Sequence, residues 1–237
     1  MSTLSDPARF NRTVFGGSMI GAALLMLGAS LVWPAIKSDE SAQLTVIAQH
    51  PARYYLCTIL ILASSMLLVP AIIGLMRMSA DRSPRLTHIG GTLSILGALV
   101  AVGDSASQLV TWQMAARGAD RAQMAALLHR FDTVAGASIV FTIGGLAVVI
   151  GMALLSIALY RSRTVPAWAA AGVEAGIVLN IAGFMAGSVG ILILSSVVLL
   201  VALGSIGLRV LAGDSDEAEA RVPRPWPSRS QRAPTSP

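Results

Sequence analysis

The chain has 237 residues, of which 54% are hydrophobic and 12% are charged, and its formal net charge is +5. A mean hydropathy of +0.71 excludes a disordered chain, and a charged fraction about half of that in soluble domains argues against a soluble globular protein. The positive charge comes from 16 arginines and one lysine at the ends of apolar runs, and this scattered arrangement excludes nucleic acid as a partner.

Six apolar runs are each long enough to cross the hydrocarbon core of a bilayer, which takes about 20 helical residues. They cover 14–36, 54–76, 89–112, 133–160, 166–186 and 189–208. Only Ala186–Ser188 separates the last two runs, but about 43 residues is twice the length of one crossing. We therefore predict an all-α, polytopic transmembrane helix bundle of six spans over residues 14–211, preceded by a short segment, 1–13.

The distribution of basic residues predicts the orientation of the bundle, because cytoplasmic segments carry an excess of arginine and lysine. The N-terminal segment, the connections after the second and fourth spans, and the end of the chain hold 12 of the 17 basic residues. The connections on the other side hold the remaining 5. Both ends of the chain are therefore predicted to be cytoplasmic, with the lipid bilayer as the main partner.

Two connections on the predicted outer side are long enough to form short helices. Ser38 or Asp39 can cap a helix within 38–50, and Asp120 can cap another within 120–131. Apolar residues recur on one side of each segment, as in helices that rest at a membrane interface. Docking of a membrane partner is the alternative interpretation of the same two segments.

The inner connections are short and rich in arginine, and the chain ends in a polar segment. Residues 212–237 contain four carboxylates followed by arginines and prolines. Their proline density and lack of apolar periodicity predict a disordered cytoplasmic tail. The arginines of the tail and of the inner connections would attract anionic lipid, and a proline-rich ligand for a partner is the alternative function of the tail.

The third span carries a stripe of small and polar residues at alternating spacings of four and three. The stripe consists of Gly90, Ser94, Gly97, Ala101, Asp104, Gln108 and Thr111. This spacing places all of them on one helix face. Because unpaired polar groups are costly in lipid, the stripe must face other helices or water, and we expect the third span to be central in the bundle.

Small residues form further stripes in three other spans. They are Ala137, Gly144, Gly151 and Ala158 in the fourth span, Gly172, Gly176, Asn180, Gly183 and Gly187 in the fifth, and Gly17 and Gly21 in the first. Such stripes let helix backbones approach closely. We expect tight packing within one bundle, and the seam of a homo-oligomer is the alternative.

Two carboxylates, Asp104 and Glu174, lie within the spans, and an ionisable residue inside the bilayer is a functional-site hypothesis by default. At a rise of about 1.5 Å per residue, Asp104 is closer in depth to Asn180 than to Glu174. We therefore predict an Asp104–Asn180 hydrogen bond with Gln108 nearby, on a path for a proton, an ion or a small polar substrate. The alternative is that both carboxyls are neutral and form only interhelical hydrogen bonds.

The sequence argues against an enzyme and predicts no catalytic residue, metal or cofactor. Cys57 is the single cysteine, which excludes an internal disulfide and a thiolate zinc site. The histidines, His50, His88 and His129, lie at span ends or in loops and cannot bridge a haem within the membrane. The sequence around Asp104 approaches the Gly-x-Gly-Asp motif of intramembrane aspartyl proteases, but residue 101 is alanine and the Tyr-Asp partner motif is missing.

Several short stretches between residues 50 and 165 carry a family resemblance. They are Pro51-Ala52-Arg53-Tyr54-Tyr55, Leu68-Val69-Pro70-Ala71, Gly74-Leu75-Met76-Arg77, Pro84-Arg85-Leu86 before Gly90-Gly91, and Asp120-Arg121 before Leu127-Leu128-His129-Arg130. With them the chain resembles a group of uncharacterised multi-pass membrane proteins from high-GC actinobacteria. The resemblance implies a bacterial cytoplasmic membrane and no activity.

Two functions remain open from the sequence. The first is a small transporter or a proton- or ion-coupled membrane protein that uses Asp104. The second is a non-catalytic membrane component, which acts in assembly, sensing or regulation through its outer helices or its tail.

Overall fold

The computed structural model describes residues 7–34, 39–116, 118–133 and 135–213, and within them it contains eight helices and no strand. Two helices are short, α2 (Glu40–Gln49) and α5 (Arg121–Thr133). The other six are long and apolar enough to cross a membrane: α1 (Pro7–Val32), α3 (Pro51–Ser79), α4 (Pro84–Met114), α6 (Ala135–Ser162), α7 (Ala167–Met185) and α8 (Val189–Ala212). The prediction of an all-α bundle with six spans is confirmed, and the chain is an integral membrane protein.

The helices extend past several of the predicted span limits. Residues 7–13 of the predicted N-terminal segment already belong to α1, because a helix continues beyond the apolar run that identifies it. The predicted tail lies outside the described residues from position 214 on. The fifth and sixth spans are separate helices, as predicted, and the turn between them contains Gly187 at a φ of +60°, a conformation that glycine adopts without steric cost.

Prolines and a glycine mark several helix ends. Pro51 and Pro84 are the first residues of α3 and α4. An N–H at this position has no partner within the helix, so proline, which lacks the N–H, loses no hydrogen bond there. Pro166 was expected to open the fifth span, but it is the N-cap residue of α7, which begins at Ala167. Gly213 ends α8 in the left-handed conformation, with a φ of +84°.

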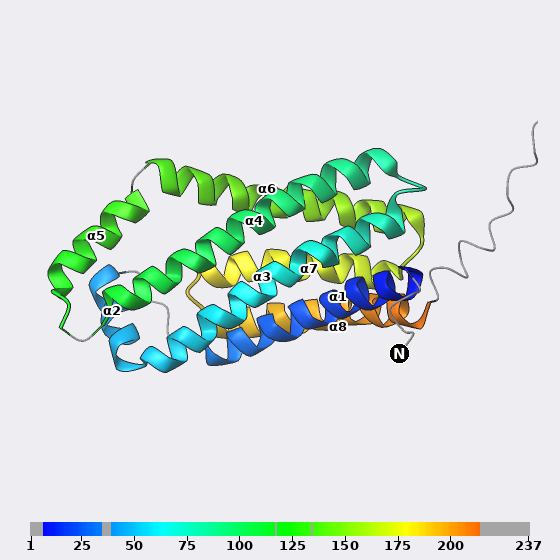
Figure 1. The fold of residues 1–237 in the computed structure, drawn as a ribbon. Helices are drawn as coiled ribbons and strands as arrows, with labels where there is room; N and C mark the ends of the chain where they lie inside the picture. Colours follow the sequence, from blue (N-terminus) through cyan, green and yellow to red (C-terminus); the bar gives the residue numbers. More distant parts are fainter. Residues whose placement is uncertain (1–6, 35–38, 117, 134, 214–237) are drawn as a thin grey trace, which may run out of the picture.

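The six spans pack around the bundle in an order that differs from their order in the chain. α1 lies between α3 and α8, α4 lies between α3 and α6, and α7 packs mainly on α8 and less extensively on α6 (Figure 1). A shared core of fully buried side chains includes Met19, Ile72, Leu155, Val173 and Ile206. The start of α1 and the end of α8 lie at one end of the bundle, which we call the termini end.

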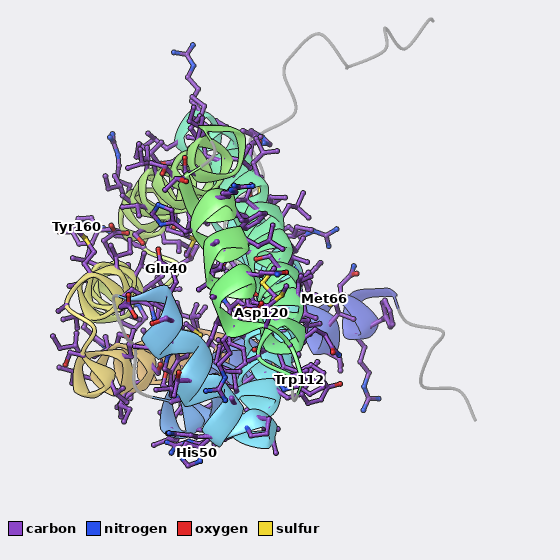
Figure 2. The ribbon with its side chains drawn as sticks, turned by 90° about the vertical axis from the view of Figure 1, so that its left-hand side faces the viewer. Glu40, His50, Met66, Trp112, Asp120 and Tyr160 are labelled. Carbon is purple, nitrogen blue, oxygen red and sulfur yellow. The ribbon has the colours of Figure 1, made fainter. Side chains whose placement is uncertain are left out.

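The expectation that the third span is central is wrong. α4 packs on α3 and α6 among the spans, and its outward side exposes large apolar residues such as Ile89, Leu96, Leu99 and Val110. Comparable exposed residues on the other helices include Met66, which lies on the opposite flank of the bundle from Tyr160 (Figure 2). Such a surface is stable where lipid is the solvent.

The small-residue stripes of α4 and α6 face each other, as expected. A Cβ atom on Gly97 would lie 2.6 Å from the carbonyl oxygen of Gly144, and one on Gly90 would lie 2.8 Å from that of Gly151. Real Cβ contacts are not this short, so the two backbones touch only because these positions are glycine. The predicted tight packing within the bundle is confirmed for this pair.

The stripe of α7 packs on α8 in the same way. Cβ atoms on Gly176 and Gly183 would collide with Leu199 and Leu192. The expectation for α1 holds for Gly21, whose Cβ would lie 3.1 Å from the side chain of Leu67 on α3, but it is wrong for Gly17, which is exposed and has nothing within 4 Å of its Cβ position. The close contact of α1 uses Gly16, whose Cβ would lie 2.7 Å from the carbonyl oxygen of Gly207 on α8.

The two short helices lie across the end of the bundle opposite the termini, which we call the α2–α5 end (Figures 1 and 2). Asp39 caps α2 by accepting a hydrogen bond from the amide of Ala42 at 2.8 Å. Asp120 accepts hydrogen bonds from the amides of Ala122 and Gln123 at the start of α5. Both predicted helices and their carboxylate caps are confirmed, and α2 packs on α5 as well as on α3 and α4.

Candidate functional site within the membrane spans

Asp104 and Gln108 form a polar pair on α4. The Nε2 of Gln108 donates a hydrogen bond of 3.2 Å to the Oδ2 of Asp104, and a spacing of four residues places both side chains on one side of the helix. Asp104 lies ten residues before Met114, the last residue of α4, or about 15 Å along the axis. That distance is half of the hydrocarbon thickness of a bilayer, and both side chains are only partly buried.

The face of α4 that carries Asp104 is the one that contacts α6. Gly97, seven residues before Asp104 and on the same face, meets Gly144 and Val148 of α6. On the neighbouring α3, Tyr54 is 7% exposed, and one turn further the hydroxyl of Thr58 donates to the carbonyl of Tyr54 at 3.0 Å.

Polar side chains continue along α4 from Asp104 toward the α2–α5 end. Ser105, Ser107 and Thr111 each donate a hydroxyl to a carbonyl three or four residues earlier in their own helix. These local bonds satisfy the hydroxyls without a partner on another helix. The oxygen atoms remain available as acceptors, so α4 carries a polar strip through this half of the membrane.

The strip ends beside a small cavity of about 90 Å³, which is lined by Ile47, Ala48, Pro51, Trp112, Gln113, Ala115 and Ala116. Trp112 closes one side, where its Nε1 donates to the carbonyl of Pro51 at 3.0 Å and its ring packs on Tyr55 with centroids 5.0 Å apart. The cavity is large enough for a few water molecules.

The predicted hydrogen bond between Asp104 and Asn180 is wrong. Asn180 is on α7, and its Nδ2 donates to the Oγ of Ser195 on α8 at 3.3 Å. α4 packs on α3 and α6, whereas α7 packs mainly on α8. Asp104 lies about 15 Å from the end of α4 and Asn180 about 8 Å from the end of α7, and their helices are not neighbours.

Glu174 lies in the other half of the membrane, two turns from the start of α7 and about 10 Å along its axis. Its Oε2 atom is buried and has no hydrogen-bond partner within the described residues. The hydroxyl of Ser156, on the adjacent α6, is also buried without a partner there. Ser156 precedes the end of α6 by six residues, or about 9 Å, so the two unpaired groups lie at similar depth on consecutive antiparallel helices.

The structure therefore divides the four candidate residues into three places. Gln108 joins Asp104, Asn180 joins the α7–α8 interface, and Glu174 lies on α7 with a buried carboxyl oxygen that has no partner among the described residues. Asp104 and Glu174 do not form a dyad, as their depths along the spans indicated.

A pair that sequence reasoning missed lies outside the membrane spans. The Nδ1 of His129 on α5 is 2.9 Å from the Oε1 of Glu40 on α2. The hydrogen bond to His129 holds the pKa of Glu40 below its usual value. The pKa of Asp39 is also lowered, first by the hydroxyl of Ser41 and then by the amide of Ala42.

No cluster of three or more histidine, cysteine or carboxylate residues that could hold a metal occurs among the described residues. His129 pairs with Glu40 instead. The sequence matches no protein-family model and no curated protein, and the fold matches no solved structure. The resemblance to actinobacterial membrane proteins therefore stays a prediction.

Proposed function

We propose that this integral membrane protein is a small proton- or cation-coupled transporter in which Asp104 binds the proton or cation. The observation that carries the proposal is the Asp104–Gln108 pair, which is joined by a 3.2 Å hydrogen bond within a helix long and apolar enough to cross a membrane. A carboxylate in a membrane span is costly and is rarely retained without a role in ion or proton movement.

The chemistry of the pair suits a group that changes its protonation state. The amide of Gln108 can donate to the ionised carboxylate, and its oxygen can accept from the protonated acid. Gln108 can therefore satisfy Asp104 in both states. The polar strip from Asp104 to the cavity beside Trp112 and Gln113 supports access from the α2–α5 end.

The test is proton and cation flux into vesicles that contain the purified protein and a pH-sensitive dye. Asp104→Asn keeps the shape of the side chain, and Asp104→Leu removes its polarity, so both should lower flux by at least about 100-fold, as for loss of a positioned proton-transfer group. Asn180→Leu is a matched control, because it removes a polar group from the α7–α8 interface. Flux that survives both Asp104 substitutions would refute the proposal.

A second candidate function, a non-catalytic component that binds a membrane partner, is favoured by α5. This helix packs on α2 through buried Leu128, but it exposes Leu127 and Phe131 outside the six spans. Replacing Leu127 and Phe131 by serine should then remove a protein that co-purifies in mild detergent. The same double substitution should leave vesicle flux unchanged if the transporter proposal is correct.

We also propose that the termini end faces the cytoplasm of a bacterial cell. The described residues at this end include eight arginines, namely Arg9, Arg12, Arg77, Arg82, Arg85, Arg161, Arg163 and Arg209, against one carboxylate, Asp81. Single cysteines introduced at Asp81 and at Gln123, in a Cys57→Ser background, should react with a membrane-impermeant maleimide from opposite sides. Labelling of Asp81→Cys from outside intact cells would reverse the orientation.

A further inference from the structure

The connection between α6 and α7 encloses an open cavity at the termini end. The cavity has a volume of about 380 Å³ and is lined by Tyr160, Arg161, Arg163, Val165 and Ala167. Two of these five residues are arginines, and both are exposed. The cavity therefore presents two guanidinium groups beside the amino end of α7, where the helix dipole adds positive potential.

Neither guanidinium has a hydrogen-bond or ion-pair partner within the described residues, and the backbone amide of Arg163 donates to the carbonyl of Tyr160 at 3.3 Å. The carbonyl of Ser162 between them is taken by Arg82, whose Nη1 donates at 2.7 Å. The hydroxyl of Ser162 is paired as well, with the hydroxyl of Thr164 at 2.8 Å. The donors of Arg161 and Arg163 are thus free for a ligand, and the backbone around them is held by other groups.

Arg163 also adopts a backbone conformation that is unfavourable for its side chain. Its φ is +57°, and it is the non-glycine residue with positive φ among the described residues. The left-handed region is sterically unfavourable for a residue that carries a Cβ atom. A turn of this kind is ordinarily served by glycine, so the guanidinium is retained here at a cost in backbone strain.

Exposed aromatic and apolar side chains occur in the cavity lining and next to it in the chain, with Tyr160 in the lining and Trp168 beside the lining residue Ala167. Tyr160 is 61% exposed and points away from the bundle (Figure 2), and Trp168 on α7 is 54% exposed. Ile157, one turn before Tyr160 on α6, is exposed too. Aromatic rings of this kind lie at the level of lipid headgroups, so a ligand in the cavity would have acyl chains available to its apolar part.

We propose that this cavity binds the phosphate-bearing headgroup of an anionic lipid, with Arg161 and Arg163 contacting the phosphate and Tyr160 and Trp168 flanking the glycerol and the upper acyl chains. The guanidinium fork matches phosphate oxygens in shape and charge. A soluble phosphate would use the arginines alone, whereas a lipid also uses the exposed aromatic flank. The site is separate from Asp104 and does not depend on the proposed transport function.

The test is native mass spectrometry of the full chain released from mixed micelles that contain equal amounts of phosphatidylglycerol and phosphatidylcholine. The wild-type protein should retain phosphatidylglycerol preferentially. Arg161→Gln combined with Arg163→Gly should lower that retention by about 25-fold, at about fivefold for each arginine. Glycine is used at position 163 because it relieves the strained backbone, so a loss of binding cannot come from a collapsed turn.

Arg85→Gln combined with Arg209→Gln is the matched control, because it removes the same charge from two other exposed arginines at the termini end. This variant should retain phosphatidylglycerol within about twofold of wild type, as expected for loss of screened, distant charge. An equal loss in the two double variants, or no preference in the wild-type protein, would overturn the proposal. Complete displacement of the lipid by millimolar inorganic phosphate would assign the cavity to a soluble anion instead.

Discussion

The Nδ1 of His129 lies 2.9 Å from the Oε1 of Glu40 and joins α5 to α2 at the end of the bundle. The two helices also share a small buried contact, in which Leu44 and Ile47 of α2 and Leu128 of α5 are almost fully covered. The polar pair is exposed, so solvent screens it. Its position between two otherwise separate connections makes it a sensitive reporter of how α2 and α5 pack.

The Glu40–His129 pair predicts that the α2–α5 contact weakens in acid. The pKa of Glu40 is lowered, first by its hydrogen bond to His129. A carboxyl with a depressed pKa contributes stability above its unfolded pKa and loses it as pH falls through the folded one. Amides of α2 and α5 should therefore exchange faster at about pH 3 than at about pH 6, after correction for intrinsic rates. Glu40→Gln should remove this dependence for the amides of α5, which Glu40 reaches through His129.

The effect of Asp39 must be distinguished from that of Glu40, because the pKa of Asp39 is lowered as well. Its pKa is lowered by Ser41 and Ala42, and its carboxylate caps α2. Asp39→Asn keeps a capping acceptor without the charge. If Asp39→Asn, and not Glu40→Gln, abolished the acid effect on α5, the effect would belong to the cap and the interpretation of the pair would be wrong.

Adjacent glycines on α6 predict opposite responses to the same substitution. A Cβ on Gly144 would collide with Val100 of α4, whereas Gly145 is exposed and has nothing within 4 Å of its Cβ position. Gly144→Ala should lower the free energy of unfolding by about 1–3 kcal/mol through overpacking. Gly145→Ala should leave it unchanged or raise it by up to about 1 kcal/mol, because alanine favours helix. Denaturant unfolding in detergent micelles measures both, and equal losses would contradict the α4–α6 contact.

Two buried serines predict opposite effects of removing a hydroxyl. The Oγ of Ser156 is buried without a partner among the described residues, so Ser156→Ala should raise the unfolding temperature. Ser196 pairs with Ser30 through a 2.7 Å hydrogen bond between α8 and α1. Ser196→Ala should destabilise the bundle by about 1 kcal/mol. If Ser156→Ala proved as damaging as Ser196→Ala, the Ser156 hydroxyl would have a partner, such as a water shared with Glu174.

The number of spans and the packing face of each helix follow from local sequence. Which helices pack on one another does not follow from it in full. Hydropathy and run length determine which segments cross lipid, and the spacing of Gly90 and Gly97 determines the contact face of α4. Depth within the predicted spans suggested similar levels for Asp104 and Asn180. The short turn between α7 and α8 makes those two helices neighbours, but no local pattern specifies that α7 and α4 lie apart, so the predicted bond between them was wrong.

A sequence pattern also does not show which of two adjacent glycines on a helix makes the contact with its partner helix. Gly17 and Gly21 have the spacing typical of helix contacts, but the contact with α8 is made by Gly16 against Gly207. The residues of a stripe are known only when the partner helix is known. For the same reason the Glu40–His129 pair had no sequence signal, because its members are 89 residues apart in two loops that meet only in the folded bundle.

We predict that lysine cannot replace Arg53, because the arginine side chain donates two hydrogen bonds at once. Its Nε donates to the carbonyl of Val32 at 2.8 Å and its Nη2 donates to that of Trp33 at 3.1 Å. The guanidinium thereby joins the start of α3 to the last carbonyls of α1, where helix ends lack internal partners. Lysine carries the same charge but has no planar fork to reach both oxygens. Arg53→Lys should therefore increase amide exchange in the last turn of α1 almost as much as Arg53→Ala does. If the Arg53→Lys variant instead kept the wild-type protection of these amides, the positive charge at the end of α1, and not the two hydrogen bonds, would be what stabilises this helix end.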